Sequence, residues 1–252
     1  MLRNSSADER KDLYSRAYDE LFQRIPLHPM LTPEPPSERN VRISKELLNL
    51  ARFITKNSVY VEIGPGDCGV AFEVAKRVKQ VFAIDVSAEI TKNVAAPANF
   101  ELILSDGSSI PVLPESVDVV YSNQLMEHLH PDDTLEQLRN IYSVLKPHGV
   151  YLCVTPNRLS GPHDVSRNYD AVATGLHLRE YTITELRRIF HEIGFSRVKV
   201  FFRFSSINVL LPVFPYTIVE KLLGVLPHGI RRAITFNRAV RFLLGAKMVA
   251  VK

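Results

Sequence analysis

The glycine-rich turn at residues 64–69 constrains this chain more than any other feature of its sequence. The alternating apolar run from Val59 to Ile63 predicts a buried strand that leads directly into the turn. The turn reads Gly-Pro-Gly-Asp-Cys-Gly, a G-x-G-x-x-G pattern, and a helical apolar pattern begins at Val70. Glycines between a strand and a helix let the backbone turn tightly and approach a ligand closely. The stretch therefore predicts a nucleotide-binding loop, and the alternative is a glycine turn without a ligand.

Acidic residues follow the next two predicted strands. The strand that begins at Gln80 ends at Asp85, 19 residues after Gly66. An acid at this place in a nucleotide-binding βαβ unit accepts hydrogen bonds from ribose hydroxyls, and the alternative is a helix N-cap. A further strand, over residues 99–104, is followed by Asp106. Because ligands bind at the carboxyl ends of the strands in such sheets, both acids are predicted to lie at the site.

Strands and helices alternate along most of the chain. Further strands are predicted over residues 117–122, 150–155, 195–204 and 246–251. A helix that opens with a capping box at Ser6, and a proline-rich segment after it, precede the nucleotide-binding unit. This alternation predicts an α/β fold with a mostly parallel sheet and helices on both faces.

Positive charge is concentrated in the last quarter of the chain. Residues 196–252 hold ten Lys and Arg and one acid, Glu220, whereas the net charge of the whole chain is only +4. The segment 205–245 begins apolar and becomes basic and amphipathic, and Pro212 and Pro215 exclude one long helix. Apolar residues with arginines at helical spacing are typical of a segment on an anionic membrane surface. The alternatives are a helical cap over the acceptor pocket and a dimer face, while the interleaved apolar residues argue against a nucleic-acid partner.

Cysteine usage and the N-terminus indicate a cytoplasmic protein. Cys68 and Cys153 are far apart and form no C-x-x-C motif, so neither a disulfide nor a zinc framework is predicted. The N-terminus is too polar for a signal peptide, and no 18 consecutive residues are apolar. If the segment 205–245 binds lipid, the expected location is peripheral, at the inner face of the membrane.

Four motifs together resemble one family, the class I S-adenosylmethionine-dependent methyltransferases, of the small-molecule type related to the ubiquinone-biosynthesis enzymes. They are Glu62 to Gly69, Ile84-Asp85, Ser105-Asp106-Gly107 and Leu145-Lys-Pro-His-Gly149. The resemblance implies a Rossmann-like α/β fold, with a seven-stranded, mostly parallel sheet, helices on both faces and an antiparallel last strand. The resemblance covers the methyltransferase core (37–204) and the last core strand (246–252). The residues themselves predict the other two parts, an N-terminal helical cover with its proline-rich loop (1–36), for which plain packing is the alternative, and a helical insertion (205–245).

The resemblance also implies which residues hold the cofactor, S-adenosyl-L-methionine. Glu62 and the backbone of Gly64 and Gly66 would hold its methionine end and the edge of the ribose. Asp85 would accept hydrogen bonds from the ribose hydroxyls. Carboxylates suit this ligand because its sulfonium and ammonium groups are cationic.

The adenine and amine contacts are implied in the same way. Val86 would pack on the adenine face, and Asp106 would accept a hydrogen bond from the adenine amino group beside the Gly107 backbone. Asn123, at the end of the fourth strand, would contact the methionine amine through its backbone.

Methylation of an alcohol requires a group that accepts its proton, usually His, Asp or Glu. The candidates near the predicted site are Glu127, His128, His130, His163, Asp164 and His177. Of these, His128, His177 and Glu127 are the predicted catalytic residues, with a structural hydrogen-bonding role as the alternative for each histidine. No spacing among them forms a convincing ligand set, so no metal is predicted.

The predicted function is therefore methyl transfer from S-adenosyl-L-methionine to a small-molecule or lipid-linked acceptor. O-methylation of a sugar, a glycolipid or a quinone-type compound is favoured. Two alternatives remain open. One is a nicotinamide-dependent oxidoreductase on a similar fold, and the other is a scaffold that binds the cofactor without turnover.

Overall fold

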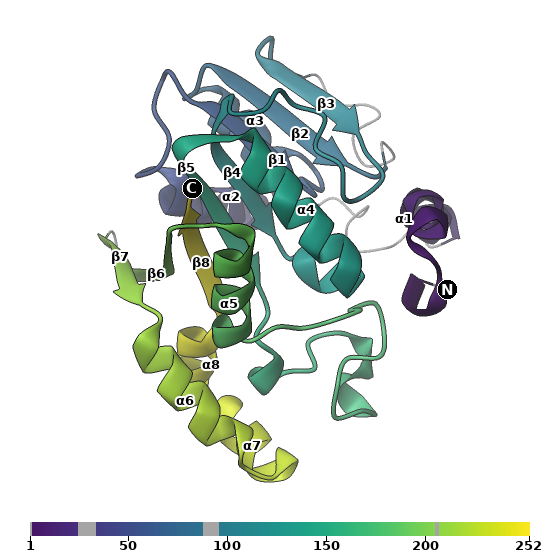
Figure 1. Cartoon of the computed structure of the whole chain (residues 1–252), viewed down its shortest axis with the longest axis vertical. Coiled ribbons are helices and arrows are strands. Elements are labelled where there is room, and N and C mark those ends of the chain that lie inside the picture. Colours follow the sequence, from purple (N-terminus) through teal and green to yellow (C-terminus); the bar gives the residue numbers. More distant parts are fainter. Residues whose placement is uncertain (1, 25–33, 88–95, 205–206) are drawn as a thin grey trace.

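The computed structural model describes residues 2–24, 34–87, 96–204 and 207–252 (Figure 1). Most of the predicted proline-rich loop lies outside these residues. The described helices are α1 (Ala7–Arg24), α2 (Pro36–Leu50), α3 (Gly69–Ala75), α4 (Pro131–Val144), α5 (Ile183–Ile193), α6 (Phe214–Gly224), α7 (His228–Thr235) and α8 (Arg238–Leu244). The strands are β1 (Val59–Ile63), β2 (Gln80–Asp85), β3 (Phe100–Leu104), β4 (Val117–Asn123), β5 (Leu145–Thr155), β6 (Arg197–Phe204), β7 (Ile207–Pro212) and β8 (Ala246–Val251).

All eight strands form one sheet in the order β3-β2-β1-β4-β5-β8-β6-β7. The first five in this order are parallel neighbours. The last strand of the chain, β8, inserts between β5 and β6 and pairs antiparallel with both. The predicted α/β class, the mostly parallel sheet and the antiparallel last strand are confirmed.

The sheet has one strand more than the seven predicted, because β7 pairs antiparallel with the edge strand β6. This strand lies inside the segment 205–245, which was predicted to be a helical insertion. The run Ile207-Asn-Val-Leu-Leu is rich in residues that favour strands, and it covers the otherwise open edge of β6. The rest of the segment forms three short helices, α6 to α8, in agreement with the expectation that its prolines exclude a single long helix.

Helices cover the sheet on both faces, with α4 and α5 on one side and α2 and α3 on the other (Figure 1). Each face has its own hydrophobic core. One core lies under α4 and α5 and includes Ile141 and Phe190, and the other lies under α2 and α3 and includes Leu50 and Val74. The two layers fix the parallel strands so that β1, β2, β3 and β4 end at the same edge of the sheet. Among the described helices, none is both long and apolar enough for a membrane span.

The irregular segment between β5 and α5 returns to this edge of the sheet. It contains two short 3-10 helices, η3 (Arg158–Ser160) and η4 (Val165–Asn168), and ends where the predicted capping box of Thr182 and Glu185 opens α5. The backbone N–H groups of Leu178 and Arg179 donate to the carbonyl of Glu127, at 2.7 and 3.1 Å. These bonds tie the segment to the short 3-10 turn η2 (Met126–His128) that follows β4.

Candidate active site

The glycine turn leaves open space at the end of β1. Gly64 and Gly66 have φ angles of +66° and +54°, in the left-handed region where a side chain is strained. A Cβ atom added to Gly66 would meet no described atom within 4 Å, so the backbone conformation rather than crowding requires glycine there. Cys68 also has a positive φ, +53°, and its side chain is buried in the core. The turn can therefore receive a ligand against its bare backbone.

Glu62, near the end of β1, is a buried carboxyl group beside this turn. Its Oε2 accepts a hydrogen bond of 3.1 Å from the hydroxyl of Tyr60, and it is only 5% exposed. Burial raises the pKa of Glu62 to about 8, and the nearby carboxylate of Glu46 contributes to the rise. A cationic ligand group placed here would favour the ionised form.

This pKa predicts how stability depends on pH. Between pH 4.5 and 8 the unfolded chain has an ionised Glu62, whereas the folded chain keeps the proton, so this contribution to stability is complete below pH 4.5 and is lost as pH rises to 8. The wild type is expected to lose stability relative to Glu62→Gln by at most about 1.4 kcal/mol per pH unit in this range. Denaturant unfolding of both proteins from pH 5 to 8 measures the difference, and parallel curves would contradict the assignment.

Asp85 lies at the tip of β2, next to the glycine turn. Its Oδ1 accepts hydrogen bonds from the backbone N–H groups of Val86 (2.7 Å) and Ser87 (3.1 Å). Burial raises the pKa of Asp85 to about 6, although bonds from Ser87, Val86 and Gly66 favour the carboxylate. Val86 follows β2 directly, as the sequence predicts, and its side chain is half-buried.

Asp106 organises the loop after β3. Its carboxylate accepts from the backbone N–H groups of Ser108 (3.0 Å) and Ser109 (2.7 Å) and from both hydroxyls. Burial opposes ionisation, but these four bonds hold the pKa of Asp106 below its usual value. These bonds within the loop use part of the capacity of the Asp106 carboxylate to accept hydrogen bonds. The Gly107 carbonyl beside it accepts a 2.7 Å bond from Gln137 of α4.

Asn123 ends β4, and its side chain amide donates to Glu46 of α2 at 3.4 Å. Strand β1 pairs in parallel with both β2 and β4. The backbone of Asn123, at the end of β4, consequently lies at the same edge of the sheet as Glu62 and Asp85. The eight predicted cofactor residues are accordingly brought to one edge of the sheet. Their roles toward a cofactor stay predictions.

Helix α1 packs across this edge. Asp19 accepts a 2.6 Å hydrogen bond from the hydroxyl of Ser87, next to Asp85. The ring of Tyr14 lies against Gly107, where an added Cβ atom would approach it to 2.8 Å. Burial, and then the charges of Asp85 and Glu127, raise the pKa of Tyr18. The predicted helical cover therefore contacts the ends of β2 and β3.

A buried ion pair holds α1 in this position. Arg10 donates two hydrogen bonds to the carboxylate of Asp133, at 2.6 and 2.8 Å, and the hydroxyl of Tyr14 donates to the same carboxylate at 2.7 Å. Both partners are almost fully buried, with side chains 3% and 7% exposed. The pair therefore fixes α1 to the N-terminus of α4.

Asp133→Ala is expected to lower the free energy of unfolding by about 3 kcal/mol, because it leaves the Arg10 guanidinium buried without its partner. Asp132→Ala is the matched control, since this neighbouring carboxylate is 77% exposed and lies 4.0 Å from the same arginine. Its effect should stay within about 0.5 kcal/mol. Denaturant unfolding measures both, and equal losses for the two variants would contradict the role given to the pair.

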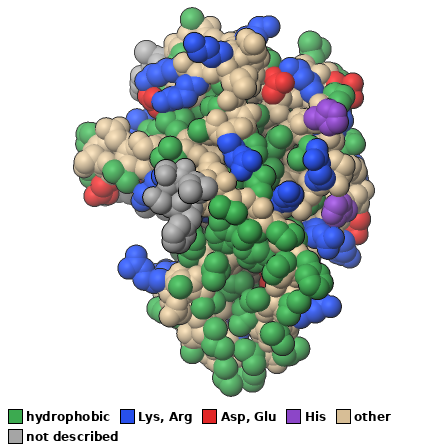
Figure 2. Space-filling view, turned by 90° about the vertical axis from the view of Figure 1, so that its left-hand side faces the viewer, with side chains coloured by type: hydrophobic (Ala, Val, Ile, Leu, Met, Phe, Trp, Pro, Cys, Tyr) green, Lys and Arg blue, Asp and Glu red, His purple; other side chains and the backbone are tan. Residues whose placement is uncertain are grey.

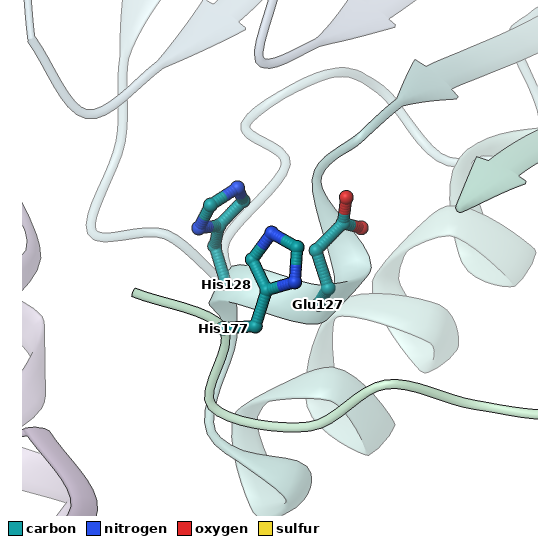
Figure 3. A group of neighbouring side chains, drawn as sticks. All are labelled: Glu127, His128 and His177. Carbon is teal, nitrogen blue, oxygen red and sulfur yellow. The ribbon is translucent and has the colours of Figure 1, made fainter. Parts of the chain in front are cut away.

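Three side chains that were predicted to be catalytic lie close together, next to the edge of the sheet that carries the predicted cofactor residues (called the cofactor edge below). Glu127 and His128 come from η2, directly after β4, and His177 comes from the segment before α5 (Figure 3). The two imidazole rings meet edge to face with their centroids 4.9 Å apart. Glu127 and His177 are buried and His128 is partly exposed. The structure thus joins residues about 50 positions apart in the sequence into one cluster.

Further polar groups orient the cluster. The Nδ1 atom of His177 lies 2.7 Å from Oε1 of Glu180, and Glu180 also lies 3.3 Å from Nδ1 of His163. Oε2 of Glu127 accepts a 2.8 Å bond from the hydroxyl of Thr155 at the end of β5. Glu180 and Thr155 were not among the candidates derived from the sequence, although Glu180 follows His177 by the i+3 spacing of a local pair.

Ionisation within the cluster follows from burial and from these partners. Burial raises the pKa of Glu127 to about 7 and lowers the pKa of His128 to about 4. Against the effect of burial, the hydrogen bond with Glu180 and the charge of Glu127 raise the pKa of His177. Against burial, the bonds with His163 and His177 lower the pKa of Glu180 to about 2. The cluster therefore contains groups that exchange protons near neutral pH.

The remaining candidates have structural partners. The Nδ1 atom of His130 accepts from the N–H of Asp132 at the start of α4. Asp164 caps η4 and accepts from the backbone N–H of His177 at 3.2 Å. His163 pairs with Glu180, as described above. These three side chains support the cluster or its helices.

Comparison with known proteins gives the family. Residues 37–200 match the model of a family described as a methyltransferase domain. A probable S-adenosylmethionine-dependent methyltransferase of Mycolicibacterium smegmatis is 29% identical over 137 residues, which cover 54% of this chain and 51% of that protein. A protein of Mycobacterium tuberculosis with the same description is 29% identical over 139 residues, 55% of this chain and 48% of its own length. This chain thus spans about half the length of these curated relatives.

Solved structures share the fold at low sequence identity. A methyltransferase described as SAM-dependent, from Archaeoglobus fulgidus, has a TM-score of 0.56 at 19% identity, and the match covers 85% of this chain and 94% of that one. A chain from the complex between the Haloferax volcanii Trm112 methyltransferase activator and a putative methyltransferase has a TM-score of 0.59 at 18% identity, covering 98% and 99%.

The relation to ubiquinone-biosynthesis enzymes is not among these findings and stays a prediction. The family model covers more than half of the chain, including β1 to β5, the glycine turn and the cluster after β4. The chain belongs to the methyltransferase domain family, within the class I S-adenosylmethionine-dependent methyltransferases.

Proposed function

We propose that this chain transfers a methyl group from S-adenosyl-L-methionine to a hydroxyl oxygen of a small or lipid-linked acceptor. The observation that carries the proposal is the cluster of Glu127, His128 and His177 beside the cofactor edge of the sheet. Groups that accept a proton are needed for an alcohol acceptor, and they lie where the parallel strands end and ligands bind.

The residues at this edge fit the proposed cofactor. Glu62 and Asp85 are carboxyl groups whose pKa burial raises. The positive charges of the cofactor would favour their ionised forms, lower both pKa values again and attract the carboxylates. The bare backbone at Gly66 leaves room for close approach. When bound, S-adenosyl-L-methionine supplies a methyl group on a sulfonium, which is a good leaving group.

The protein's own residues then have two tasks. Transfer is an in-line displacement, so the chain must hold the acceptor oxygen in line with the methyl group. Nε2 of His177 is the atom best placed to accept the hydroxyl proton, because its Nδ1 is paired with Glu180. Packing of α1 over the edge supports exclusion of water from the site.

A turnover assay tests the proposal against its two alternatives. The protein is incubated with S-adenosylmethionine and hydroxylated acceptors, including a glycolipid and a quinone precursor, and release of S-adenosylhomocysteine is followed. The expected result is release that depends on an acceptor, with the methyl group found on oxygen. Binding of S-adenosylhomocysteine without turnover on any acceptor would favour the scaffold. A rise in melting temperature with NADH alone would favour the oxidoreductase.

We further propose that the helices α6 to α8 rest on an anionic membrane surface, which would make the acceptor lipid-linked. Apolar side chains gather over this part of the molecule (Figure 2). The large hydrophobic residues that are more than one-third exposed in these helices are Phe214, Ile218, Val219, Leu222, Ile230, Ile234, Phe242 and Leu243. The same helices carry Lys221, Arg231, Arg232, Arg238 and Arg241. Exposed apolar residues with nearby cationic side chains favour binding to an anionic interface.

Sedimentation with lipid vesicles tests this surface. The protein is expected to bind vesicles containing phosphatidylglycerol and to bind pure phosphatidylcholine weakly, because each cation near the surface contributes about 1 kcal/mol. Phe242→Ser should weaken binding to both vesicles, and Arg241→Gln should reduce only the preference for the anionic lipid. Absence of binding together with a dimer on gel filtration would assign the surface to a subunit contact instead.

A further inference from the structure

We propose that Glu127, His128 and His177 form a binding site for a divalent first-row transition metal ion such as Zn²⁺. One ligand atom from each of the three side chains lies within 4.8 Å of the other two. Figure 3 shows the ring of His177 between the ring of His128 and the side chain of Glu127. No sequence spacing indicates this set, because His177 reaches the cluster only through the fold.

The histidines are oriented as ligands are. Nδ1 of His177 lies 2.7 Å from Oε1 of Glu180, and Nδ1 of His128 lies 3.3 Å from the carbonyl oxygen of Leu176. With the proton on Nδ1 in each ring, Nε2 retains a lone pair. Metal-binding histidines almost always donate their other N–H to a carboxylate or a backbone carbonyl, and both partners are present here.

The carboxylate supplies an independent indication. Oε2 of Glu127 accepts from Thr155, but its Oε1 is buried and has no hydrogen-bond partner among the residues that the structure describes. A buried oxygen without a partner is costly, and a cation would satisfy it. The set of two imidazoles and one carboxylate is that of catalytic Zn²⁺ sites and of other first-row metals, whereas Mg²⁺ and Ca²⁺ prefer oxygen ligands.

Distances and charges agree with such an ion. Bonds of about 2.0–2.2 Å place tetrahedral ligand atoms roughly 3.3 Å apart, so side-chain shifts of about 1 Å close the set. The carboxylates of Glu180 and Asp164 act electrostatically on the cluster and add negative potential. Three protein ligands leave coordination positions open for water or an acceptor oxygen. The partial exposure of His128 leaves one side of the site accessible.

The site deepens the proposed function, and its catalytic role rests on that function. An acceptor hydroxyl bound to the cation becomes more acidic. Its O–H bond then breaks with the proton passing to water, the O–CH₃ bond forms, and the S–CH₃ bond of the cofactor breaks. In the metal-loaded protein His177 is a ligand rather than the base, so methyl transfer is predicted to depend on the metal.

Metal titration of the full chain, stripped beforehand with a chelator, tests the site. Co²⁺ is added to wild type, Glu127→Gln, His128→Gln, His177→Gln and the control His191→Gln, whose imidazole is exposed at the end of α5. Calorimetry and the Co²⁺ absorption spectrum report binding. We expect one tight site in wild type and the control, and affinity at least tenfold weaker in the three cluster variants. Glu180→Gln should weaken binding about 10–100-fold.

Equal Co²⁺ affinity in wild type and the cluster variants would overturn the metal site, provided that circular dichroism shows folded variants. Binding of S-adenosylhomocysteine is measured on the same samples to separate the two proposals. If it binds and methyl transfer proceeds in chelator, the proposed function stands and the metal inference fails. If it does not bind although Co²⁺ does, the methyltransferase function fails and the metal site stands.

Discussion

Replacing Asp85 with alanine is expected to weaken the binding of S-adenosylhomocysteine about a hundredfold, or about 2.7 kcal/mol. The carboxylate at the tip of β2 is proposed to accept hydrogen bonds from two ribose hydroxyls, and a bond to a charged group contributes about 1.5–3 kcal/mol. Calorimetric titration of wild type and variant measures the change. The effect is expected to be large because Asp85 is the only carboxylate in β2, so no other side chain of this strand can replace it.

The same carboxylate also accepts from the N–H groups of Val86 and Ser87, so loop disorder is an alternative cause of weak binding. Asp85→Asn separates the two, because its side chain oxygen still caps the loop but lacks the charge. Glu101→Gln, on the exposed side of β3, is the matched control and should bind as wild type does. Wild-type affinity in Asp85→Ala would remove Asp85 from the cofactor site.

A second large effect is expected at His177. His177→Gln should reduce the rate constant of methyl transfer by roughly 10²–10⁴-fold, the usual contribution of a positioned acid or base. Affinity for S-adenosylhomocysteine should be unchanged, since the residue is proposed to act on the acceptor. The expectation holds whether the imidazole accepts the proton itself or holds a metal ion. The measurement is kcat with an acceptor found in the turnover assay.

The control for this variant is His191→Gln, which removes an imidazole outside the cluster. Glu180→Gln should lower kcat less than His177→Gln does, because Glu180 orients the imidazole without reaching the acceptor. Full activity in His177→Gln would leave the cluster with a structural role only.

The part of the fold that local sequence determines was predictable. The positive φ angles of Gly64 and Gly66 and the acids at the ends of β2 and β3 leave clear signals, because glycine and acidic residues at these places have few structural alternatives. The capping box of α5 is equally local, since Thr182 and Glu185 satisfy each other within one turn. These elements lie where the sequence predicts them.

Features that depend on distant pairing were not predictable in the same way. Strand β7 was missed because its existence depends on the free edge of β6, whereas prolines and basic residues dominate the segment as a whole. Thr155 joins the cluster because β5 pairs with β4. Glu180 is paired locally with His177, but the sequence does not show that the chain after β5 brings this pair back to Glu127. Likewise, the buried pair of Arg10 and Asp133 joins residues 123 positions apart.

A crystal structure of the protein with S-adenosylhomocysteine tests the central claim most directly, because it locates the cofactor and the acceptor cluster together. We predict the ribose at Asp85, the adenine beside Asp106, and the sulfur directed toward Glu127, His128 and His177. A ligand bound elsewhere, or one whose sulfur points away from this cluster, would contradict it.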